Sequence, residues 1–586
     1  MAPDYLSIDR VKSAERIERD IETLAGPDYT TSSEAIRRYA YVDAYRNTLD
    51  YFTRELEAIG FEVFEDPVGN LIGRNRPRGE KAYGVGSHCD SNRNGGKYDG
   101  TMGVVVALEA CRVNQELDLG LPLQLISFLE EESSGFGEPL LGSRVMAQRI
   151  EEQHLREGVR HLDDGRSFFE HAKDAGYEPE RWRECIHDLD GLAGWIEMHI
   201  EQGRVLQDAG ERLGVVTAIV GLLWADLTIY GRADHAGGTP MSLRQDAGSV
   251  AAEVTLELER LAREAGEGTV GTTGQCEFKP GLKNVIPGEA HLGFDIRSVD
   301  AESYRGVAGG IAEFAEQAAA RRGMRAEFVQ RSDSPATPMD EGVVGALTAA
   351  AEASGEPFRR MPSGAGHDTQ VIAPHVPSAM LFVPCKDGVS HDPSEEADPA
   401  DGALAVEVML NAIHSLAAVR YSAAVRQDGA FVYSWLVFIH IIGVLGFFFA
   451  HGVSTAMALR LQHERNPDRI RVVLQLSASS TGVFYVSTML LLLGGLWAGF
   501  KGSWWDQGWI GVSLGIFVAN MVFMYAAASP YYKRIREVMT IDESGGGTVA
   551  PAELDALLTS RRPKLLLLVG GVSLGFITYL MVQKPF

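Results

Sequence analysis

The spacing of apolar residues changes character near residue 420 of this 586-residue chain. Before that point, short apolar or alternating runs that predict strands are separated by stretches with helical spacing. Beyond it lie four apolar runs, each close to the roughly 18–20 residues that cross the hydrocarbon of a bilayer. They cover about residues 431–459, 472–500, 509–528 and 565–582. The pattern therefore predicts a globular part followed by an all-α transmembrane four-helix domain over residues 421–586.

The globular part has the pattern of an α/β protein. Alternating predicted strands and helices indicate a mixed sheet flanked by helices; the clearest strands are 61–64, 123–129, 194–203 and 379–383. Between residues 213 and 329, strand pairs alternate with two long helical runs, which predicts an inserted α+β domain. We therefore expect a main domain formed by residues 1–212 and 330–420, interrupted by the insert.

Charge is distributed unevenly between the two parts. From residue 421 onward there are 13 Lys+Arg and 9 Asp+Glu, whereas the first 420 residues hold 41 and 70. An acidic globular part argues against nucleic acid as a partner, because phosphate binding needs a basic face. The five cysteines are dispersed without CxxC spacing, which predicts reduced thiols in a cytosol-like compartment.

Candidate chemistry centres on GSHCDSNRNGGKYDGTMG, residues 86–103. Its predicted context is strand, loop, helix, so that His88 lies at the carboxyl edge of a sheet, where open α/β folds bind ligands. His88 and Asp99 suit metal ligation, and Asp90 is placed to accept the second imidazole N–H of His88. The alternative is a solvated Gly-rich loop, since His and Asp are common in such loops.

A second unusual feature is the triplet Glu130-Glu131-Glu132 at the end of a predicted buried strand. Three adjacent carboxylates are costly to hold together unless cations neutralise them or one stays protonated. An exposed acidic turn is the alternative. His199, on the strand of residues 194–203, is compatible either with metal ligation or with an ordinary core position.

Together these segments resemble the metal-dependent amidohydrolases that include N-carbamoyl-L-amino-acid hydrolases, allantoate amidohydrolases and β-ureidopropionases. That family belongs to the clan of dimetal aminoacylases and carboxypeptidases. The resemblance covers about residues 10–418 and rests on motifs in order along the chain: GSHCD, GGKYDGTMGV, EEESSGFG, EMHIEQG, GRADHAGGTPM with NVIPGEAHLGFDIR, and SGAGHD with GVSHDPSEE.

The resemblance implies two divalent metal ions per subunit, of manganese, zinc, cobalt or nickel, since mixed His and carboxylate ligands accept several ions. The implied ligands are His88, Asp99, Glu132, His199 and His391, with Asp99 bridging the two ions. Glu131 would be the general base on a metal-activated water, and Asp90 would support the catalytic centre from behind His88.

The insert of residues 213–329 would act as a lid and dimerisation domain and carry His235, Asn284 and Arg297. By resemblance these three reach the substrate: Arg297 would clamp a carboxylate, and the other two would stabilise an oxyanion, with His235 acting across a homodimer interface. Gln202 and His367 are further substrate candidates. Without the motif, Arg297 would be interpreted as a surface strand residue. The family usually has Gly and Arg where this chain has Ser133 and Gly135, which leaves the orientation of that loop open.

The membrane domain matches no function that the sequence reveals. His440 and His451 lie eleven residues apart, on one face of the first span; we favour hydrogen bonding between helices over a haem or metal pair. Loops one and three of this domain are rich in Arg and Lys, which by the positive-inside rule places them in the cytoplasm. A large acidic hydrolase without an apolar leader would instead face the cytoplasm itself. We expect an integral membrane protein of the cell membrane with a cytoplasmic hydrolase domain, against the charge of the loops.

The predicted activity is hydrolysis of a ureido or amide C–N bond, other than a peptide bond, in a small carboxylate such as an N-carbamoyl-L-amino acid or allantoate. One alternative is an aminoacylase or dipeptidase of the same clan. A second, of another class, is an inactive hydrolase fold that senses a ligand for the membrane domain.

Overall fold

In the computed structural model, the described residues are 5–501, 504–505, 507–543 and 551–583. The side chains of 419–432, 501, 540–543 and 551 lie outside that description. The chain forms two compact units, Met1–Val419 and Arg420–Phe586. The break falls where the apolar pattern changes, so the division between a globular part and a membrane part follows from hydropathy.

The main domain of the first unit is built on a nine-stranded mixed sheet. Its order is β1-β2-β4-β3-β5-β13-β6-β11, and β12 pairs with β6. The strands are β1 (Glu62–Glu65), β2 (Leu71–Arg74), β3 (Ala82–His88), β4 (Leu123–Phe128), β5 (Leu192–Ile200), β6 (Leu213–Ile219), β11 (Thr337–Pro338), β12 (Phe358–Ser363) and β13 (Ser378–Val383). In the centre β4, β3, β5 and β13 run parallel. Strands β3, β4 and β13 are buried along their whole length, as parallel strands covered on both faces are.

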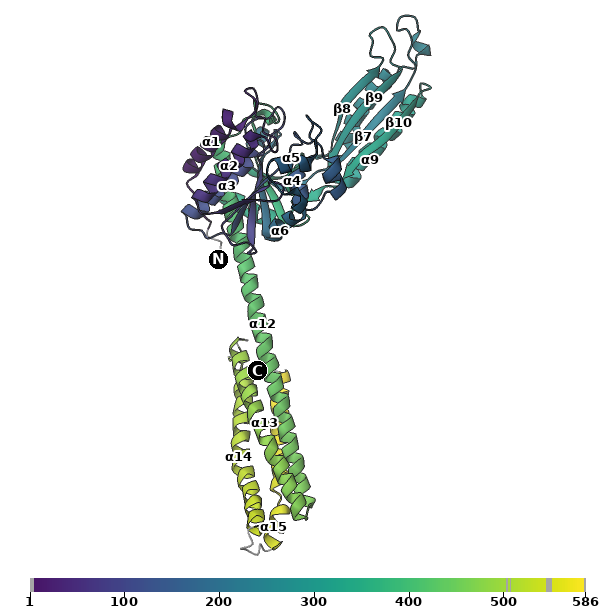
Figure 1. The fold of residues 1–586 in the computed structure, drawn as a ribbon. Helices are drawn as coiled ribbons and strands as arrows, with labels where there is room; N and C mark the ends of the chain where they lie inside the picture. Colours follow the sequence, from purple (N-terminus) through teal and green to yellow (C-terminus); the bar gives the residue numbers. More distant parts are fainter. Residues whose placement is uncertain (1–4, 502–503, 506, 544–550, 584–586) are drawn as a thin grey trace. The chain divides into compact units, whose positions relative to one another are not determined.

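Helices cover this sheet. Those of the main domain are α1 (Arg10–Leu24), α2 (Asp43–Ala58), α3 (Thr101–Glu116), α4 (Leu141–Met146), α5 (Phe168–Asp174), α6 (Ile186–Asp190), α7 (Val205–Ala209), α10 (Glu341–Ser354), α11 (Asp368–Ile372) and the start of α12 (Pro399–His463). Helix α3 packs on β3, β4 and β5, and α1 and α2 lie beside it (Figure 1). Residues 101–114 of α3 are all buried, which explains why this segment is apolar on every side.

The insert has a sheet and a hydrophobic core of its own. Strands β7 (Gly221–Tyr230), β8 (Val270–Lys279), β9 (Glu289–Ser298) and β10 (Arg325–Ser334) form an antiparallel sheet in the order β10-β7-β9-β8. Alternate residues of β7 and β9, such as Leu227 and Ile296, are buried against α8 (Ala247–Glu264) and α9 (Ala301–Ala320). Figure 1 shows α9 lying along this sheet. The predicted α+β composition of the insert is therefore present.

The boundaries of the insert differ from the predicted 213–329. Strand β6 belongs to the nine-stranded sheet, where it pairs with β13 and β12, and β10 continues to Ser334. The four-stranded sheet thus spans Gly221–Ser334. The two neighbouring strands β6 and β7 are separated by a single residue, Val220, and hydropathy does not reveal that the chain changes sheets there.

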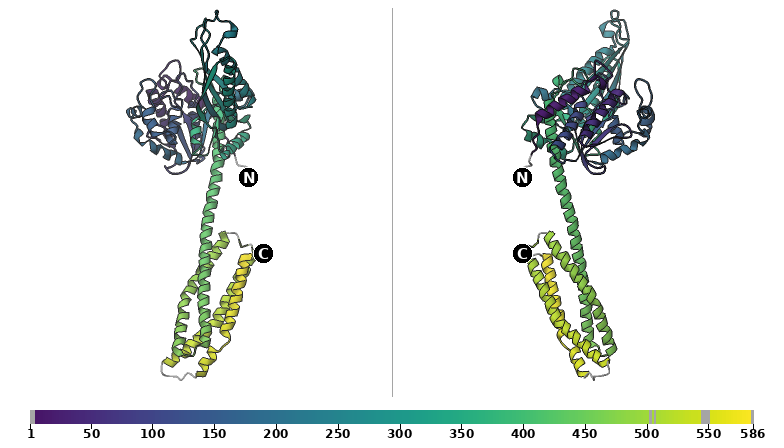
Figure 2. Two further views of the ribbon diagram at one scale, coloured as in Figure 1. Left: turned by 90° about the vertical axis from the view of Figure 1, so that its right-hand side faces the viewer. Right: turned by 60° about the vertical axis from the view of Figure 1, so that its left-hand side comes forward.

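The second unit consists of long apolar helices. They are the later part of α12, α13 (Pro467–Lys501), α14 (Gly508–Glu543), the short α15 (Pro551–Leu558) and α16 (Arg562–Gln583). Within the described residues, four segments are long and apolar enough to cross a membrane: Tyr433–His463, Pro467–Phe500, Gly508–Met539 and Ala552–Gln583. Figure 2 shows the long helices of this unit side by side. Large apolar side chains such as Phe449 and Val522 are about two-thirds exposed, as expected for surfaces that face lipid.

Candidate metal centre

The carboxyl ends of the parallel strands bring the sequence-predicted metal ligands together. His88 is the last residue of β3, His199 is next to last in β5, and Glu132 follows β4. His391 lies beyond β13, and Asp99 lies two residues before α3. Because β3, β4, β5 and β13 are parallel, their carboxyl ends share one edge, and five residues spread over 304 positions of the chain converge there.

Asp99 is the centre of this arrangement. One carboxylate oxygen, Oδ1, lies 3.1 Å from His199 Nε2 and 3.8 Å from His88 Nε2. The other, Oδ2, lies 3.3 Å from His391 Nε2, which is also 3.3 Å from Glu132 Oε1. The ligand atoms of His88, Asp99 and His199 all lie within 4.8 Å of one another, and so do those of Asp99, Glu132 and His391.

These two groups share Asp99, so its carboxylate stands between two sets of donors. Each set contains imidazole nitrogen and carboxylate oxygen, which suit divalent transition metals. A buried group of carboxylates also needs compensating positive charge. The residues present therefore fit two divalent ions bridged by Asp99.

The imidazole rings are oriented through their other nitrogens. His199 Nδ1 lies 2.9 Å from the Ile200 carbonyl oxygen, which holds the ring with Nε2 toward Asp99. His88 Nδ1 lies 3.3 Å from the backbone carbonyl of Asp90 and 3.4 Å from its carboxylate. The carboxylate of Asp90 also accepts the backbone N–H groups of Glu131 and Glu132, each at 3.1 Å. Asp90 therefore positions the glutamate segment as well as His88.

The three adjacent glutamates have three different surroundings. Glu130 is fully buried and accepts backbone N–H bonds from Ala40, Gly135 and Phe136, so it shapes the following loop. Glu131 Oε2 lies 3.8 Å from His88 Nε2, and Glu132 faces His391. The positive φ of 53° at Glu130 turns the chain so that its neighbours face the centre. The electrostatic repulsion among the three carboxylates is thus offset by backbone amides, by imidazoles and by the candidate cation sites.

Burial and charge perturb the pKa values of this group. Burial, together with Asp99, raises the pKa of Glu132 to about 7, and burial raises the pKa of Glu131 well above its usual range. The hydrogen bond to Asp99 raises the pKa of His391 to about 9. Burial alone would raise the pKa of Asp99, but hydrogen bonds from His199 and His391 hold it well below its usual range. Such perturbed, interacting groups are typical of functional sites.

Sequence reasoning missed two residues that hold Asp99. Glu395 is buried, and its Oε2 accepts the backbone N–H groups of Tyr98 and Asp99 at 2.8 and 2.9 Å. Ser390 Oγ donates to Asp99 Oδ2 at 2.5 Å. Both belong to GVSHDPSEE, almost 300 residues from Asp99. Their place in the motif around His391 was the only signal in the sequence.

Gln202 and His367 lie within the centre. Gln202 Nε2 donates to Asp99 Oδ2 at 2.9 Å. The buried His367 ring packs on His199 with centroids 4.5 Å apart, and its Nε2 lies 3.1 Å from Ser363 Oγ. Burial holds the pKa of His367 well below its usual range, so this imidazole is neutral. A neutral imidazole can donate or accept a hydrogen bond without adding charge beside the candidate metal ligands.

Of the three candidates from the insert, Arg297 lies apart from His235 and Asn284 within one chain. Arg297 makes a bidentate pair with Asp295, at 2.8 Å for each contact, and donates to the Gly364 carbonyl at 2.7 Å. This last bond joins the insert to the segment that carries His367. His235 and Asn284 are exposed and adjacent, since Ala236 N donates to the Asn284 carbonyl at 3.0 Å. They flank the end of β9 at Glu289, whereas Arg297 lies at its other end.

The loop after Glu132 departs from the family pattern at Ser133 and Gly135 and is held by other contacts. Arg93 Nε donates to the Ser134 carbonyl at 3.0 Å, and its guanidinium pairs with Asp163 at 2.9 Å. Phe136 is buried and packs edge-on against the ring of His161 at 5.2 Å. The loop therefore contacts a guanidinium although the usual arginine of the family is replaced by Gly135. This guanidinium belongs to Arg93, in the segment that follows His88.

Comparison with known proteins agrees with this geometry. Residues 81–415 match the family described as peptidase family M20/M25/M40, and residues 434–585 match a predicted integral membrane protein family, DUF2269. An N-carbamoyl-L-amino acid amidohydrolase of Geobacillus stearothermophilus is 37% identical over 66% of this chain and 94% of its own length. The allantoate amidohydrolase of Escherichia coli is 31% identical over 65% of this chain and 92% of its own length.

Solved structures show the same likeness. An amidase of the hydantoinase/carbamoylase family from Burkholderia ambifaria is 31% identical, with a TM-score of 0.63 over 70% of this chain and 98% of its own. The resemblance predicted from the motifs and the α/β fold followed by a helical membrane domain are both confirmed. The chain therefore belongs to the peptidase family M20/M25/M40, and it carries an integral membrane domain of the DUF2269 type at its C-terminal end.

Proposed function

We propose that the first unit is a dimetal amidohydrolase that cleaves the ureido C–N bond of a small carboxylate such as an N-carbamoyl-L-amino acid or allantoate. The observation that carries this proposal is the position of Asp99 between two groups of metal-ligand atoms, with Glu131 beside them. Similarity to amidohydrolases over nearly the whole length of those relatives supports the reaction class.

His88, Asp99 and His199 would hold one divalent ion, and Asp99, Glu132 and His391 the other. When bound, the two ions lower the pKa of a shared water and polarise the scissile carbonyl. Glu131 accepts the proton of the attacking water and then donates it to the leaving nitrogen. For this transfer its carboxylate must stay out of the ligand set, and Glu131 belongs to neither group of converging ligand atoms. With a ureido substrate, breakdown of the carbamate product yields ammonia and carbon dioxide.

Substrate recognition is assigned to Arg297, Gln202 and His367. The guanidinium of Arg297 faces the segment of residues 363–368 through its bond to Gly364, where it can pair with a substrate carboxylate. Asp295 fixes the plane of that guanidinium through two hydrogen bonds. A planar, oriented guanidinium favours a carboxylate over a neutral group, so the proposed substrate is anionic.

His235 and Asn284 would complete the site of a second subunit. About eight residues of β9 separate their end of the strand from Arg297, or roughly 26 Å at 3.3 Å per residue. No side chain reaches that far. Both residues are exposed, so they are available to a partner. We therefore propose a homodimer in which each insert supplies His235 and Asn284 to the neighbouring centre as oxyanion donors.

The hydrolase unit is proposed to face the cytoplasm, against the charge of the membrane loops. Its five free thiols and its acidic composition support this side of the membrane. Cys276 is the exposed thiol of the five. A membrane-impermeant maleimide should therefore label Cys276 in lysed cells but not in intact cells, with Cys276→Ser as the control. Labelling of Cys276 in intact cells would place the unit outside.

The central test combines metal analysis with a substrate panel on the full chain in detergent. Glu131→Gln should keep two metals per subunit and lose turnover by at least about a thousandfold, in the range of general acid–base contributions. Asp99→Ala should lose the metals. N-carbamoyl, N-acyl and dipeptide substrates, tested side by side, separate the proposal from an aminoacylase or dipeptidase. Metal-replete wild type that is inert on all three classes would refute enzymatic function and favour a sensor.

A further inference from the structure

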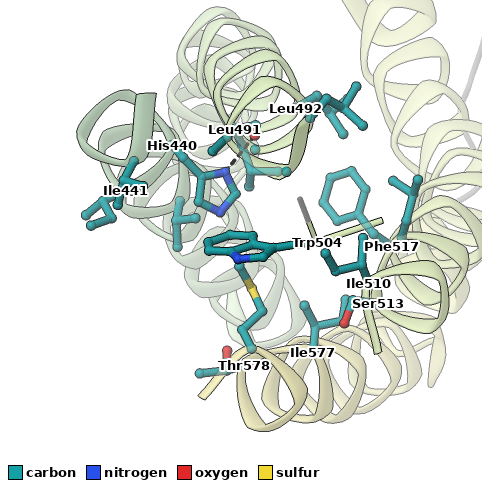
Figure 3. A pocket seen from close by; sticks show the side chains of 18 of the residues that line it. His440, Ile441, Leu491, Leu492, Trp504, Ile510, Ser513, Phe517, Ile577 and Thr578 are labelled. Atoms are coloured by element: carbon teal, nitrogen blue, oxygen red, sulfur yellow. Dashed lines mark hydrogen bonds between the residues drawn. The ribbon is translucent and has the colours of Figure 1, made fainter. Parts of the chain in front are cut away.

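The membrane unit contains a cavity of about 520 Å³ between its helices. It is lined by α12, α13, α14 and α16 and by the connection between α13 and α14, and nearly all of its wall is aliphatic or aromatic. Figure 3 shows Trp504 and Phe517 with their rings at this space. A cavity of this size between the helices of a bundle is large enough for a small-molecule ligand.

His440 lines this cavity and carries an unpaired acceptor nitrogen. Its Nδ1 lies 2.7 Å from the Leu491 carbonyl oxygen. A carbonyl only accepts, so Nδ1 carries the proton and the neutral ring leaves a lone pair on Nε2. Nε2 is enclosed and has no hydrogen-bond partner among the described residues. Helix α13 accommodates the imidazole because Gly495 has no side chain there: a Cβ would lie 2.7 Å from His440 Nδ1.

A second unpaired polar atom lines the same cavity. Ser513 on α14 is buried, and its Oγ has no hydrogen-bond partner among the described residues. In Figure 3, Ser513 lies across the space from His440, with Trp504 between them in the view. Thr578, by contrast, is satisfied by its bond to the Leu574 carbonyl at 2.8 Å. The cavity therefore offers two separate polar atoms in an apolar surrounding, and unpaired buried polar atoms are costly.

The chemistry of the wall restricts the occupant. None of the described lining residues carries a formal charge, so ligands with carboxylates or phosphates, including haem propionates, have no cationic partner. An acyl chain would fill the volume but leave His440 Nε2 unpaired. His451, the other histidine of this span, is not among the lining residues, and its Nε2 lies against Gly570, where a Cβ would be only 3.1 Å away. Among the described lining residues, His440 is the one imidazole, and the thioether of Met581 is the other side chain able to ligate a porphyrin iron, but a porphyrin's propionates would have no cationic partner there.

We propose that this cavity binds a lipid-soluble quinol, with one hydroxyl donating to His440 Nε2 and the opposite oxygen bonded to Ser513. A quinol is neutral, planar and apolar except at two oxygens on opposite edges of the ring, which matches the two unpaired atoms. The oxidised quinone has only acceptor oxygens, so it cannot bond to the lone pair of Nε2. The site therefore discriminates between the two redox forms in favour of the reduced one.

The test measures binding of decylubiquinol and decylubiquinone to the full chain in lipid nanodiscs, by quenching of tryptophan fluorescence under anaerobic conditions. Wild type should bind the quinol about tenfold more tightly than the quinone, the difference made by one hydrogen bond to a buried acceptor. His440→Leu should abolish this preference. His451→Leu is the matched control, since it removes the other intramembrane imidazole of the same helix and should keep the preference.

Three results would overturn the proposal: equal affinity for the two redox forms in wild type, no binding of either form, or equal loss of preference in both histidine variants. A Soret absorption band in the purified protein that His440→Leu removes would identify a porphyrin as the occupant instead. Hydrolase turnover and the gel-filtration profile, which should be unchanged in both variants, confirm that the variants fold. The outcome is independent of the hydrolase proposal, because neither histidine belongs to the metal centre.

Discussion

The loop before α3 packs so closely on His88 that one added methyl group should disrupt the metal centre. Gly100 has a φ of 60°, and a Cβ built there would lie 2.2 Å from His88 Cε1 and 2.3 Å from its Nε2. Non-bonded carbons approach to about 3.5 Å, so in Gly100→Ala the imidazole must move by roughly 1.3 Å. Metal–ligand distances tolerate only about 0.2 Å. We therefore expect a loss of metal affinity of at least about 100-fold, the upper range for disturbing a ligand's support.

Gly120→Ala is the matched control for this substitution. Gly120 has a similar φ, 64°, but nothing lies within 4 Å of the position that an alanine methyl group would take there. Both variants place alanine at a positive φ, which is a strained conformation for a residue with a Cβ. Thermal unfolding of Gly120→Ala should report the cost of the positive φ alone, whereas elemental analysis and competition with a chelator should show metal loss only in Gly100→Ala. Equal metal content in the two variants would refute the geometry assigned to His88.

Three further predictions concern the metal centre and its substrate. Subunits with Glu131→Gln and subunits with His235→Ala, each inactive alone, should recover about a quarter of wild-type turnover when unfolded and refolded together in equal amounts. The reason is that only the mixed dimer contains one intact centre. No recovery would mean that His235 acts within its own chain. Arg297→Lys should raise KM for an N-carbamoyl amino acid about tenfold or more without changing metal content, since an ammonium lacks the planar guanidinium that Asp295 orients. An unchanged KM would remove Arg297 from the site. Glu395→Gln should lower metal affinity about 10–100-fold, because one carboxylate oxygen of Glu395 orients two backbone amides of the Asp99 loop. If titration with a chelator gave the same metal affinity as in wild type, the Asp99 loop would need no such support.

The parts that sequence reasoning predicted share a physical property: they are specified locally. A run of about 20 apolar residues predicts a membrane helix whatever surrounds it, and the motifs around His88 and His391 carry their ligands with them. Contacts between distant segments were not predictable in this way. Glu395 supports Asp99 from 296 positions away, and no property of either segment alone indicates the pairing. The transfer of β6 to the nine-stranded sheet was missed for the same reason, since strand partners are chosen by tertiary packing.

Local pattern also could not distinguish the members of the glutamate triplet. All three are chemically identical and adjacent, yet Glu130 faces backbone amides, Glu131 faces His88 and Glu132 faces His391. What separates them is the backbone turn at Glu130, a non-glycine residue with positive φ. Gln202 and His391 share that unusual conformation, and such strain concentrates at functional sites. The resemblance to the family could distinguish the three glutamates only because members of a family share this backbone turn, which the residue pattern alone does not reveal.

Buried polar groups, which lower stability when unpaired, indicate sites in both units, but only once their hydrogen-bond partners have been identified. The buried Glu130 carboxylate is costly in isolation, yet three backbone N–H bonds satisfy it, and it therefore needs no ligand to explain it. His440 differs: its Nδ1 is satisfied by Leu491 and its Nε2 has no partner among the described residues. The expected hydrogen bond between helices is thus present, but it accounts for only one of the two ring nitrogens. The Nε2 of His451 also has no partner among the described residues, but His451 does not line the cavity. An unpaired nitrogen on a residue that lines a cavity, more than an imidazole within an apolar span, is therefore what indicates a binding site.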